Sequence, residues 1–189
     1  MTGFFVPSPG ITMVPAAAAH APALVQFTRQ NSEHLRAFLP AVLELDSLDE
    51  ATHYLHAMED GAADGEIREW YLFSDAELCG SIRVKDIDAC DRKAKVGYFL
   101  GSAFAGKGIM TASLRVILHH CFTTLELNRI ELHCAATNSA SQAVAQRLGF
   151  TREGVLREDE WLNGAFVDIH VYGLLRAEFM GSVAKKAQC

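Results

Sequence analysis

Gly106-Lys107-Gly108 is the segment whose residue types and spacing are best suited to binding a ligand. Neither glycine carries a Cβ, so the backbone can turn tightly and approach a ligand closely. An amphipathic helix is predicted to follow, because apolar residues recur at helical spacing: Met110, Leu114, Ile117, Leu118, Cys121 and Phe122. The first N–H groups of such a helix lack internal partners and lie at the positive end of its dipole. The sequence therefore predicts that a phosphate-bearing ligand binds at about residues 105–111.

Two familiar phosphate-binding patterns fit these residues incompletely. A dinucleotide fingerprint would need a third glycine at Thr111. A nucleotide P-loop matches from Gly101 to Lys107, but Gly108 stands where a hydroxyl would coordinate magnesium. A nucleotide hydrolase is therefore disfavoured, and a glycine-rich turn without a ligand stays open as the alternative.

The elements around this turn are predicted from periodicity. Alternation predicts a largely buried strand before the turn and a half-buried strand over residues 129–137. A short helix should follow Asn138-Ser139 and end at Gly149, with three residues on its inner face: Ala140, Val144 and Leu148. Asn163-Gly164, between two strand-like runs, is the preferred dipeptide of a two-residue type I′ hairpin.

In this order, the segments resemble the GNAT superfamily of acetyl-CoA-dependent N-acetyltransferases, and within it the ribosomal-protein-serine N-acetyltransferase branch. The matching pieces span about residues 78–175: Gly97-Tyr98-Phe99-Leu100, Gly106-Lys107-Gly108-Ile109-Met110-Thr111, Asn128-Arg129, Asn138-x-x-Ser141, Arg147-Leu148-Gly149-Phe150-x-x-Glu153-Gly154, Trp161-Leu162-Asn163-Gly164 and Asp168-x-x-x-Tyr172. A further N-terminal stretch, Asn31 to Leu35 with Leu39-Pro40, resembles the same branch, so the resemblance covers nearly the whole chain.

The chain departs from this pattern at three positions. Ala105 and Met110 stand where the family's loop usually opens with Gln or Arg and closes with Gly or Ala. Losing the long polar side chain removes one phosphate contact, although backbone amides need no particular side chain. Lys95 stands where related sequences often carry an acid, which weakens any proposal of a catalytic carboxylate on that strand.

The resemblance implies that acetyl-CoA is the co-substrate and identifies residues that bind it. Its phosphates would contact the loop residues Gly106, Lys107, Gly108, Ile109, Met110 and Thr111. Its pantetheine arm would pair like an added strand, and a backbone N–H around Phe99–Leu100 would stabilise the oxyanion. Asn138 would hold the arm, and Ser141 would stabilise the departing thiolate by a hydrogen bond. The alternative for this segment, that Asn138 or Ser139 merely caps the helix, is compatible with both roles.

Glu160 is the candidate general base. In a two-residue hairpin, Leu162 faces Ala165 and Trp161 faces Phe166, so Glu160 faces Val167 and lies on an apolar face. A carboxylate there would be partly desolvated, which makes it a stronger base. The resemblance points to the same residue. The alternative is that Glu160 lies at an exposed hairpin end, with Glu158 or a water chain as the base.

Two aspartates should lie opposite each other on the other face of this hairpin. Asp159 and Asp168 would then need an intervening cation or hydrogen-bond donor, because like charges directly opposite each other are unfavourable.

Composition predicts a soluble, cytoplasmic enzyme. No apolar run approaches the ~20 residues of a membrane span, and Met1 to Pro9 lacks the basic region of a signal peptide. The five cysteines have scattered spacings, which predicts free thiols in a reducing compartment. The net charge of −6 argues against a nucleic-acid partner, and no set of residues has zinc spacing. We therefore expect no metal, no membrane partner and an amine acceptor, with a homodimer left open.

The predicted fold is α+β in three layers: a mixed, mostly antiparallel twisted sheet of about seven strands flanked by helices. One domain should span residues 1–189, with a core at about 11–178 and short flexible ends. The expected elements before the turn are a strand at 11–15, a helical region at 17–38 interrupted near Asn31, a helix capped by Ser47 that ends at about Asp60, and strands at 67–74, 77–86 and 93–100. Ser47 and Glu50 have the spacing of a capping box.

The function predicted from these features is direct acetyl transfer to a primary amine. The acceptor is either a protein N-terminal α-amine, as in the ribosomal-protein branch, or a small amine. The alternative from a different class is a non-catalytic CoA-binding sensor or interaction protein with a degenerate site, which Ala105 and Lys95 support.

Overall fold

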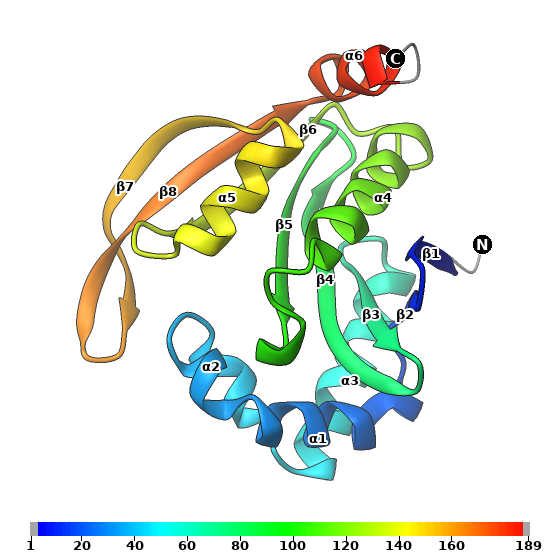
Figure 1. Ribbon diagram of the computed structural model, residues 1–189, viewed down its shortest axis with the longest axis vertical. Helices are drawn as coiled ribbons and strands as arrows, with labels where there is room; N and C mark the ends of the chain where they lie inside the picture. Colours follow the sequence, from blue (N-terminus) through cyan, green and yellow to red (C-terminus); the bar gives the residue numbers. More distant parts are fainter. Residues whose placement is uncertain (1–3, 187–189) are drawn as a thin grey trace.

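Apolar residues alternate onto both faces of the sheet, so both faces need a cover of helices. The computed structural model describes residues 4–186 and shows the predicted α+β architecture (Figure 1). Its sheet has eight strands in the order β1-β2-β3-β4-β5-β6-β8-β7. In the described residues β5 and β6 are the one parallel pair, and the other neighbours run antiparallel, as predicted. The strands are β1 (Phe5–Ser8), β2 (Ile11–Pro15), β3 (Arg68–Ser74), β4 (Glu77–Asp88), β5 (Lys93–Leu100), β6 (Arg129–Ala135), β7 (Thr151–Leu162) and β8 (Ala165–Leu175).

Two groups of helices cover the two faces. On one face α4 and α5 pack on the larger apolar cluster, and on the other α1, α2 and α3 form a second cluster with Tyr71 and Phe99 (Figure 1). The helices are α1 (Ala21–Gln30), α2 (Ser32–Arg36), α3 (Leu48–Ala63), α4 (Ile109–Thr123), α5 (Ser139–Leu148) and α6 (Arg176–Lys186), with short 3-10 turns at Ala18–His20, Pro40–Glu44 and Ser102–Phe104. We call these the α4 face and the α1 face of the sheet.

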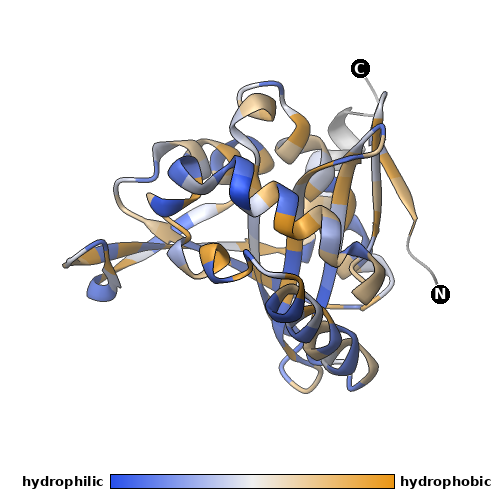
Figure 2. Ribbon diagram, turned by 90° about the horizontal axis from the view of Figure 1, so that it is seen from below, coloured by the Kyte–Doolittle hydropathy of each residue, from blue (hydrophilic) through white to orange (hydrophobic). Residues whose placement is uncertain are grey.

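The β7–β8 hairpin extends beyond the helices that cover the sheet. In the view from below, it projects from the body of the molecule and carries both polar and apolar residues (Figure 2). No helix within residues 4–186 is long and apolar enough to cross a membrane.

The structure adds two elements to the prediction. Residues 5–8 form an edge strand, β1, so the sheet has eight strands rather than about seven. Pro7 argues against a strand in the sequence, because proline has no backbone N–H to donate. An edge strand can nevertheless carry such a residue. At the other end α6 extends the fold past the predicted limit of 178, and Phe179 packs against Phe122 with ring centroids 5.3 Å apart. Residues 1–3 and 187–189, where flexible ends were predicted, lie outside the described residues.

The predicted helix boundaries are largely confirmed. The helical region breaks at Asn31, between α1 and α2, and the Ser47 hydroxyl accepts a hydrogen bond from Glu50 N at 3.3 Å to cap α3. The α3 helix continues to Ala63, past the predicted end near Asp60. Asn31 also ties the α1 end to the loop after β5, because its Oδ1 accepts from Ser102 N at 3.0 Å.

A buried carboxylate fastens α3 to the sheet. Glu69 on β3 is only 6% exposed, and its oxygens accept hydrogen bonds from Tyr54 on α3 at 2.5 Å and from Ser81 on β4. Arg83 lies 3.4 Å from the same carboxylate and also donates to the Tyr54 hydroxyl. Although Arg83 Nε makes no hydrogen bond, the ion pair of Arg83 with Glu69 keeps the buried carboxylate paired, and the network links a helix and two strands.

We expect Glu69→Ala to lower the free energy of unfolding by about 2–3 kcal/mol, because it leaves Arg83 and Tyr54 without their acceptor. Urea unfolding followed by circular dichroism measures this. Glu66→Ala is the matched control, because Glu66 is exposed just before the same strand. Equal stability of the two variants would contradict a structural role for the Glu69 network.

Candidate active site

The predicted turn before α4 has the conformation that its glycines permit. Gly106 and Gly108 have φ values of 74° and 78°, in the left-handed region that residues with a Cβ rarely adopt. Gly108 is the N-cap of α4, which begins at Ile109 as the sequence predicted. A Cβ at either glycine would meet no atom within 4 Å, so the backbone faces open space.

The N-terminus of α4 therefore forms an accessible site for an anion. Residues 105–108 are exposed, whereas Ile109 and Met110 are buried and anchor the helix beneath the turn. Thr111 is partly buried in the first turn of the helix. The Lys107 ammonium lies 5.5 Å from the centroid of the Phe104 ring, next to the free N–H groups. This arrangement can hold phosphate groups by backbone amides and a nearby cation.

The strands β5 and β6 part just before this turn. Their parallel pairing covers four positions and ends at Val96 and Leu132, although β5 continues to Leu100 and β6 to Ala135. Beyond that point β5 stays paired with β4, and β6 stays paired with β8. The inner edges of the two strands are therefore left open to a ligand; we call this opening the wedge.

Backbone groups of β5 are directed into the wedge. Leu100 pairs with Gly80 in the register, and Gly101 N donates to Cys79 O at 2.8 Å. In an antiparallel ladder, the backbone N–H and C=O of Leu100 therefore point away from β4, towards the wedge. The backbone groups of Tyr98, two residues earlier, point the same way. Of the two residues predicted to stabilise an oxyanion, Leu100 thus presents its N–H to the wedge, while Phe99 packs its side chain on Phe27 at 5.0 Å between centroids.

Ser141 and Asn138 lie on the far side of the wedge. Asn138 caps α5, because its Oδ1 accepts from Ser141 N at 3.0 Å. Leu148 is buried in α5 and Val144 packs against the core, as predicted, whereas Ala140 is exposed. Ser141 and Ala145 are buried in its place, which brings the Ser141 hydroxyl inward, 2.8 Å from the Tyr98 hydroxyl.

The structure adds Tyr98 to the candidate residues. Burial raises the pKa of the Tyr98 phenol to about 12, so the group stays protonated and can donate a hydrogen bond at neutral pH. Burial also raises the pKa of the Cys134 thiol, which lies beside Ser141. In the sequence, the alternation of Val96, Tyr98 and Leu100 already placed a phenol on a buried face, where it needs a hydrogen-bond partner.

The hairpin has the predicted register, but its surroundings differ from the expectation. Asn163 and Gly164 have φ values of 50° and 87°, as a type I′ turn requires, and Glu160 pairs with Val167. Glu160 is nevertheless exposed, so the predicted desolvation of its carboxylate is wrong for the chain alone. The hairpin end extends beyond the helices that cover the sheet, so the Glu160 carboxylate is accessible to water.

The expected opposition of Asp159 and Asp168 does not form. The register of β7 against β8 shifts between Leu156 and Glu160, and Glu158 has a φ of 52°. Asp168 Oδ1 accepts a hydrogen bond from Glu158 N at 2.9 Å, so this bulge supplies the donor that the aspartate needs.

The hairpin is joined to the α2 end on the α1 face of the sheet. Asn163 Nδ2 donates to Arg36 O at 3.0 Å and to Ala37 O at 3.3 Å. Beneath this link, Leu162 and Ile169 of the hairpin pack with Ala135 of β6 and with Phe38. Glu160 precedes Leu162 by two residues and therefore lies on this same side. The sequence did not predict the link, because its two ends are over a hundred residues apart.

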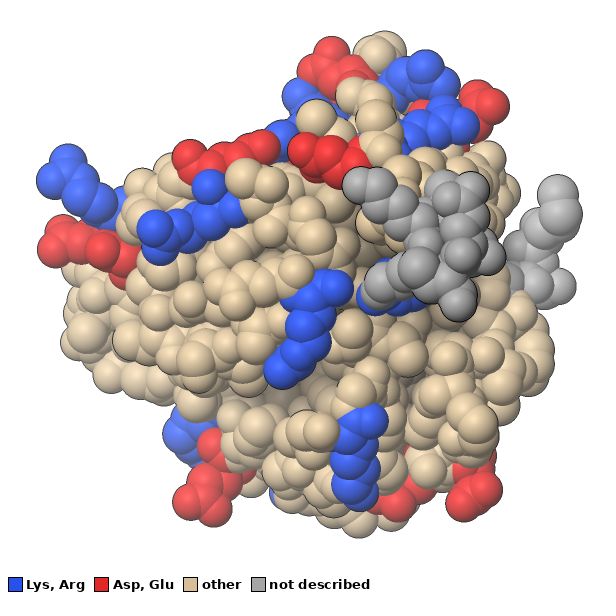
Figure 3. Space-filling model, turned by 45° about the horizontal axis from the view of Figure 1, so that its top comes forward, with Lys and Arg blue, Asp and Glu red and all other residues tan. Residues whose placement is uncertain are grey.

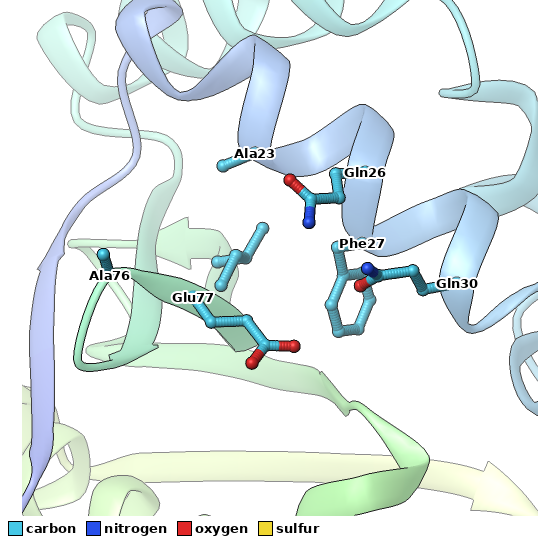
Figure 4. A pocket seen from close by; sticks show the side chains of 7 residues that line it. Ala23, Gln26, Phe27, Gln30, Ala76 and Glu77 are labelled. Atoms are coloured by element: carbon cyan, nitrogen blue, oxygen red, sulfur yellow. The ribbon is translucent and has the colours of Figure 1, made fainter.

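A separate hollow of about 360 Å³ lies between α1 and the β3–β4 turn (Figure 4). Gln26, Phe27 and Gln30 of α1 face Glu77 across it. None of the predicted site residues lines this hollow. On the surface shown in Figure 3, acidic and basic side chains lie next to one another at several places, with wide areas between them that carry neither.

The comparisons with known proteins agree with this geometry. Residues 11–151 match the family model described as acetyltransferase (GNAT) domain. The chain is 34% identical over 108 residues to the ribosomal-protein-serine acetyltransferase of Escherichia coli. It is 41% identical over 110 residues to a Bacillus subtilis protein named for ribosomal N-acetylation, an activity that its name marks as unproven. These matches cover 57% and 58% of this chain, and the chain spans 60% of the length of each relative.

A solved structure matches over more of the chain. It is RimL, a ribosomal L7/L12 alpha-N-protein acetyltransferase in complex with coenzyme A, which is joined to a cysteine of that protein by a disulfide. The two structures superpose with a TM-score of 0.87 at 28% sequence identity. The match covers 92% of this chain and 98% of the other.

Proposed function

Because this chain belongs to the acetyltransferase (GNAT) domain family, we propose that it transfers an acetyl group from acetyl-CoA directly to a primary amine. One observation carries the proposal: the wedge between β5 and β6 leads directly into the glycine turn at the α4 N-terminus. An extended, amide-bearing arm with phosphates at one end and a thioester at the other fits this order of sites. The phosphates belong at Gly106 to Thr111, and the arm belongs along the open edge of β5.

The thioester sulfur belongs beside Ser141. The hydroxyls of Ser141 and Tyr98 lie together at the far side of the wedge, and both can donate to a departing thiolate. The RimL complex supports this position, because a cysteine of that protein is bonded to the coenzyme A sulfur. In the present chain the Cys134 thiol also lies next to Ser141.

The reaction then needs few residues. The backbone N–H of Leu100, directed into the wedge, is suited to stabilise the oxyanion of the tetrahedral intermediate. An α-amine with a pKa near 8, or a lysine near 10.4, arrives largely as the ammonium and must lose a proton before it attacks. Glu160, which is exposed on the α1 face of the hairpin, is the proposed acceptor of that proton.

The acceptor amine is proposed to be a protein N-terminus. RimL and the Escherichia coli relative are named for acetylation of ribosomal proteins, and Glu160 is exposed, so the end of a protein chain can reach it. A small amine is the second candidate, because a spermidine N(1)-acetyltransferase of Vibrio cholerae is 27% identical over 112 residues. Turnover with N-terminal peptides against polyamines, followed by mass spectrometry, separates the two.

The free thiols fit a reducing compartment. Cys79, Cys90, Cys121 and Cys134 are all unpaired. A cytoplasmic enzyme therefore remains the proposal.

Substituting Gly108 tests the phosphate site. We expect Gly108→Asp to weaken acetyl-CoA binding by about tenfold or more, because it adds a negative charge where the phosphates would bind. Gly108→Asn is the matched control, because Asn has the same shape and also tolerates positive φ but carries no charge. Isothermal titration calorimetry of both folded variants measures the difference; equal affinities would place the phosphates elsewhere.

Removing the Ser141 hydroxyl tests the thiolate site. We expect Ser141→Ala to lower kcat by about 10-fold to about 100-fold with little change in the Kd for acetyl-CoA, because charge develops on sulfur only as it departs. The cap of α5 survives, since it uses the backbone N–H of Ser141. The loss should be constant from about pH 6 to about pH 9, because the pKa of Tyr98 at about 12 keeps its phenol protonated throughout.

Ser139→Ala is the control for this variant, because Ser139 is exposed in the same turn of the helix. An effect confined to the KM for acetyl-CoA would make Ser141 a binding residue instead.

Replacing Glu160 tests the first proton acceptor. We expect Glu160→Gln to lower kcat/KM by about 10²–10⁴-fold near neutral pH. The loss should shrink as pH rises, sooner for an α-amine than for lysine, because more of the amine is already deprotonated. Steady-state rates across pH measure this, with Asp159→Asn as control. A loss that is equal at every pH would mean that Glu160 positions the acceptor without taking its proton.

A further inference from the structure

A row of charged side chains crosses β6 on the α1 face of the sheet. His133 Nε2 lies 3.0 Å from Glu131 Oε2, and Arg129 donates to Glu131 Oε1 at 3.0 and 3.1 Å. Arg129 also donates to Glu153 Oε1 on β7 at 2.7 Å. Gly173 makes room for this pair, because a Cβ there would collide with the side chains of Glu153 and Arg129. The row is therefore held in place at both ends.

His133 lies where the wedge opens. Val96 and Leu132 are the last paired residues of β5 and β6, so Gly97 and His133 are the first residues past the parting. Alternation places both on the α1 face, whereas Tyr98 and Cys134 point to the α4 face. A Cβ at Gly97 would meet nothing within 4 Å, so there is open space across the wedge from the imidazole.

The hydrogen bond to Glu131 fixes which imidazole nitrogen is free. Burial opposes ionisation of Glu131, but hydrogen bonds from Arg129 and His133 outweigh it and lower the pKa of that carboxyl. An ionised carboxylate can only accept, so Nε2 carries the proton and Nδ1 of a neutral imidazole has an unshared pair. His133 is 30% exposed at its side chain and reaches solvent on this face.

Charged side chains of both signs surround His133. Asp86 on β4 lies close enough to interact with His133, and Glu131 contacts it directly. Lys95 on β5 pairs with Asp86 at 2.9 Å, and Arg129 pairs with Glu131 and with Glu153. Lys85 and Lys93 also interact with these carboxylates, Lys85 with Asp86 and Lys93 with Glu131. Val171, opposite on β8, is uncharged.

We propose that His133 is a second catalytic proton acceptor, with Glu131 as its positioning residue. This inference rests on the proposed acetyl transfer to an amine. It assigns the two protons that an ammonium must lose to two residues: the first to Glu160 before attack, and the second to His133 after attack.

The attack, the proton transfers and the departure of the thiolate account for every bond formed and broken. The free amine's electron pair forms the N–C bond to the thioester carbon, and the carbonyl π pair moves to oxygen, which leaves a positively charged nitrogen beside an oxyanion. His133 Nδ1 takes one N–H proton, so that nitrogen becomes neutral and the imidazole becomes an imidazolium held by Glu131. The oxygen pair then re-forms the carbonyl, and the C–S pair leaves on sulfur. The thiolate remains beside the Ser141 and Tyr98 hydroxyls.

The contributions of the two proton acceptors, Glu160 and His133, to the rate depend differently on pH, so measurements across pH can tell them apart. A base that deprotonates the ammonium matters less at high pH, where solvent has already removed that proton. The proton lost after attack must leave at every pH, so a neutral His133 remains useful at high pH and is useless once protonated. The rate ratio of wild type to His133→Gln should therefore rise with pH, to about 10²-fold where the imidazole is neutral, whereas the ratio for Glu160→Gln should fall.

The experiment measures kcat/KM of His133→Gln and Glu160→Gln across pH with one N-terminal peptide. Gln keeps an N–H donor near Nε2 and so preserves the contact with Glu131, while it removes the basic nitrogen. His56→Gln is the matched control, because His56 Nδ1 lies 3.1 Å from Glu59 Oε2 in an exposed pair on α3. Thermal melting of each variant, with His133→Asn as a second substitution, separates loss of basicity from loss of fold.

Opposite pH trends of the two variants support the proposal. A His133→Gln ratio that is constant across pH, or that follows the Glu160→Gln trend, overturns it. Glu131→Gln should reproduce the His133 trend in part, whereas Glu153→Gln, which touches only Arg129, should not. If the wild type binds no acetyl-CoA, the proposed function fails; if it turns over and His133→Gln matches it at every pH, only this inference fails.

Discussion

The structure depends on a sheet that cannot stay closed between two of its strands. β5 and β6 are paired at four positions, and each then follows its outer neighbour, β4 or β8, to its end. Backbone donors and acceptors along the inner edges are left without strand partners. Buried groups of this kind need hydrogen bonds, so the opening favours water or an extended ligand with amides of its own. The gap in the sheet and the binding site are the same feature.

Contacts on both faces hold this opening in place. On the α4 face, the Tyr98–Ser141 hydrogen bond spans it from β5 to α5. On the α1 face, Asn31 fixes the α1 end to Ser102, at the start of the glycine turn, and Asn163 fixes the hairpin end to the backbone at Arg36. Each contact joins segments far apart in the chain. The wedge therefore keeps its width through tertiary hydrogen bonds rather than through the two strands that form it.

Local chemistry made most of the fold predictable. The glycine turn, the caps of α3 and α5, the type I′ hairpin and its register all depend on residues within a few positions of one another, and all were predicted. The misses have longer-range causes. Pro7 conceals an edge strand that forms by pairing with β2. The inward turn of Ser141 depends on packing against β5, and the exposure of Glu160 depends on how far the hairpin extends. Tyr98 and His133 were both visible as alternating positions, but only the parting of β5 and β6 gives those positions a common site.

The period of the strands separates the two kinds of chemistry in the wedge. Successive side chains of a strand point to opposite faces, so Gly97 and Tyr98, and likewise His133 and Cys134, divide between the α1 face and the α4 face. The α4 face receives neutral groups that keep their protons, as the raised pKa of Tyr98 ensures. The α1 face receives carboxylates, cations and the imidazole of His133, which is partly exposed to solvent. A one-residue slip in β5 or β6 would move Tyr98 to the α1 face or His133 to the α4 face, away from the groups with which each is proposed to act. β5 is paired with β4 up to Leu100, and β6 is paired with β8 up to Ala135. These pairings prevent the slip in the part of the sheet where β5 and β6 are no longer paired with each other.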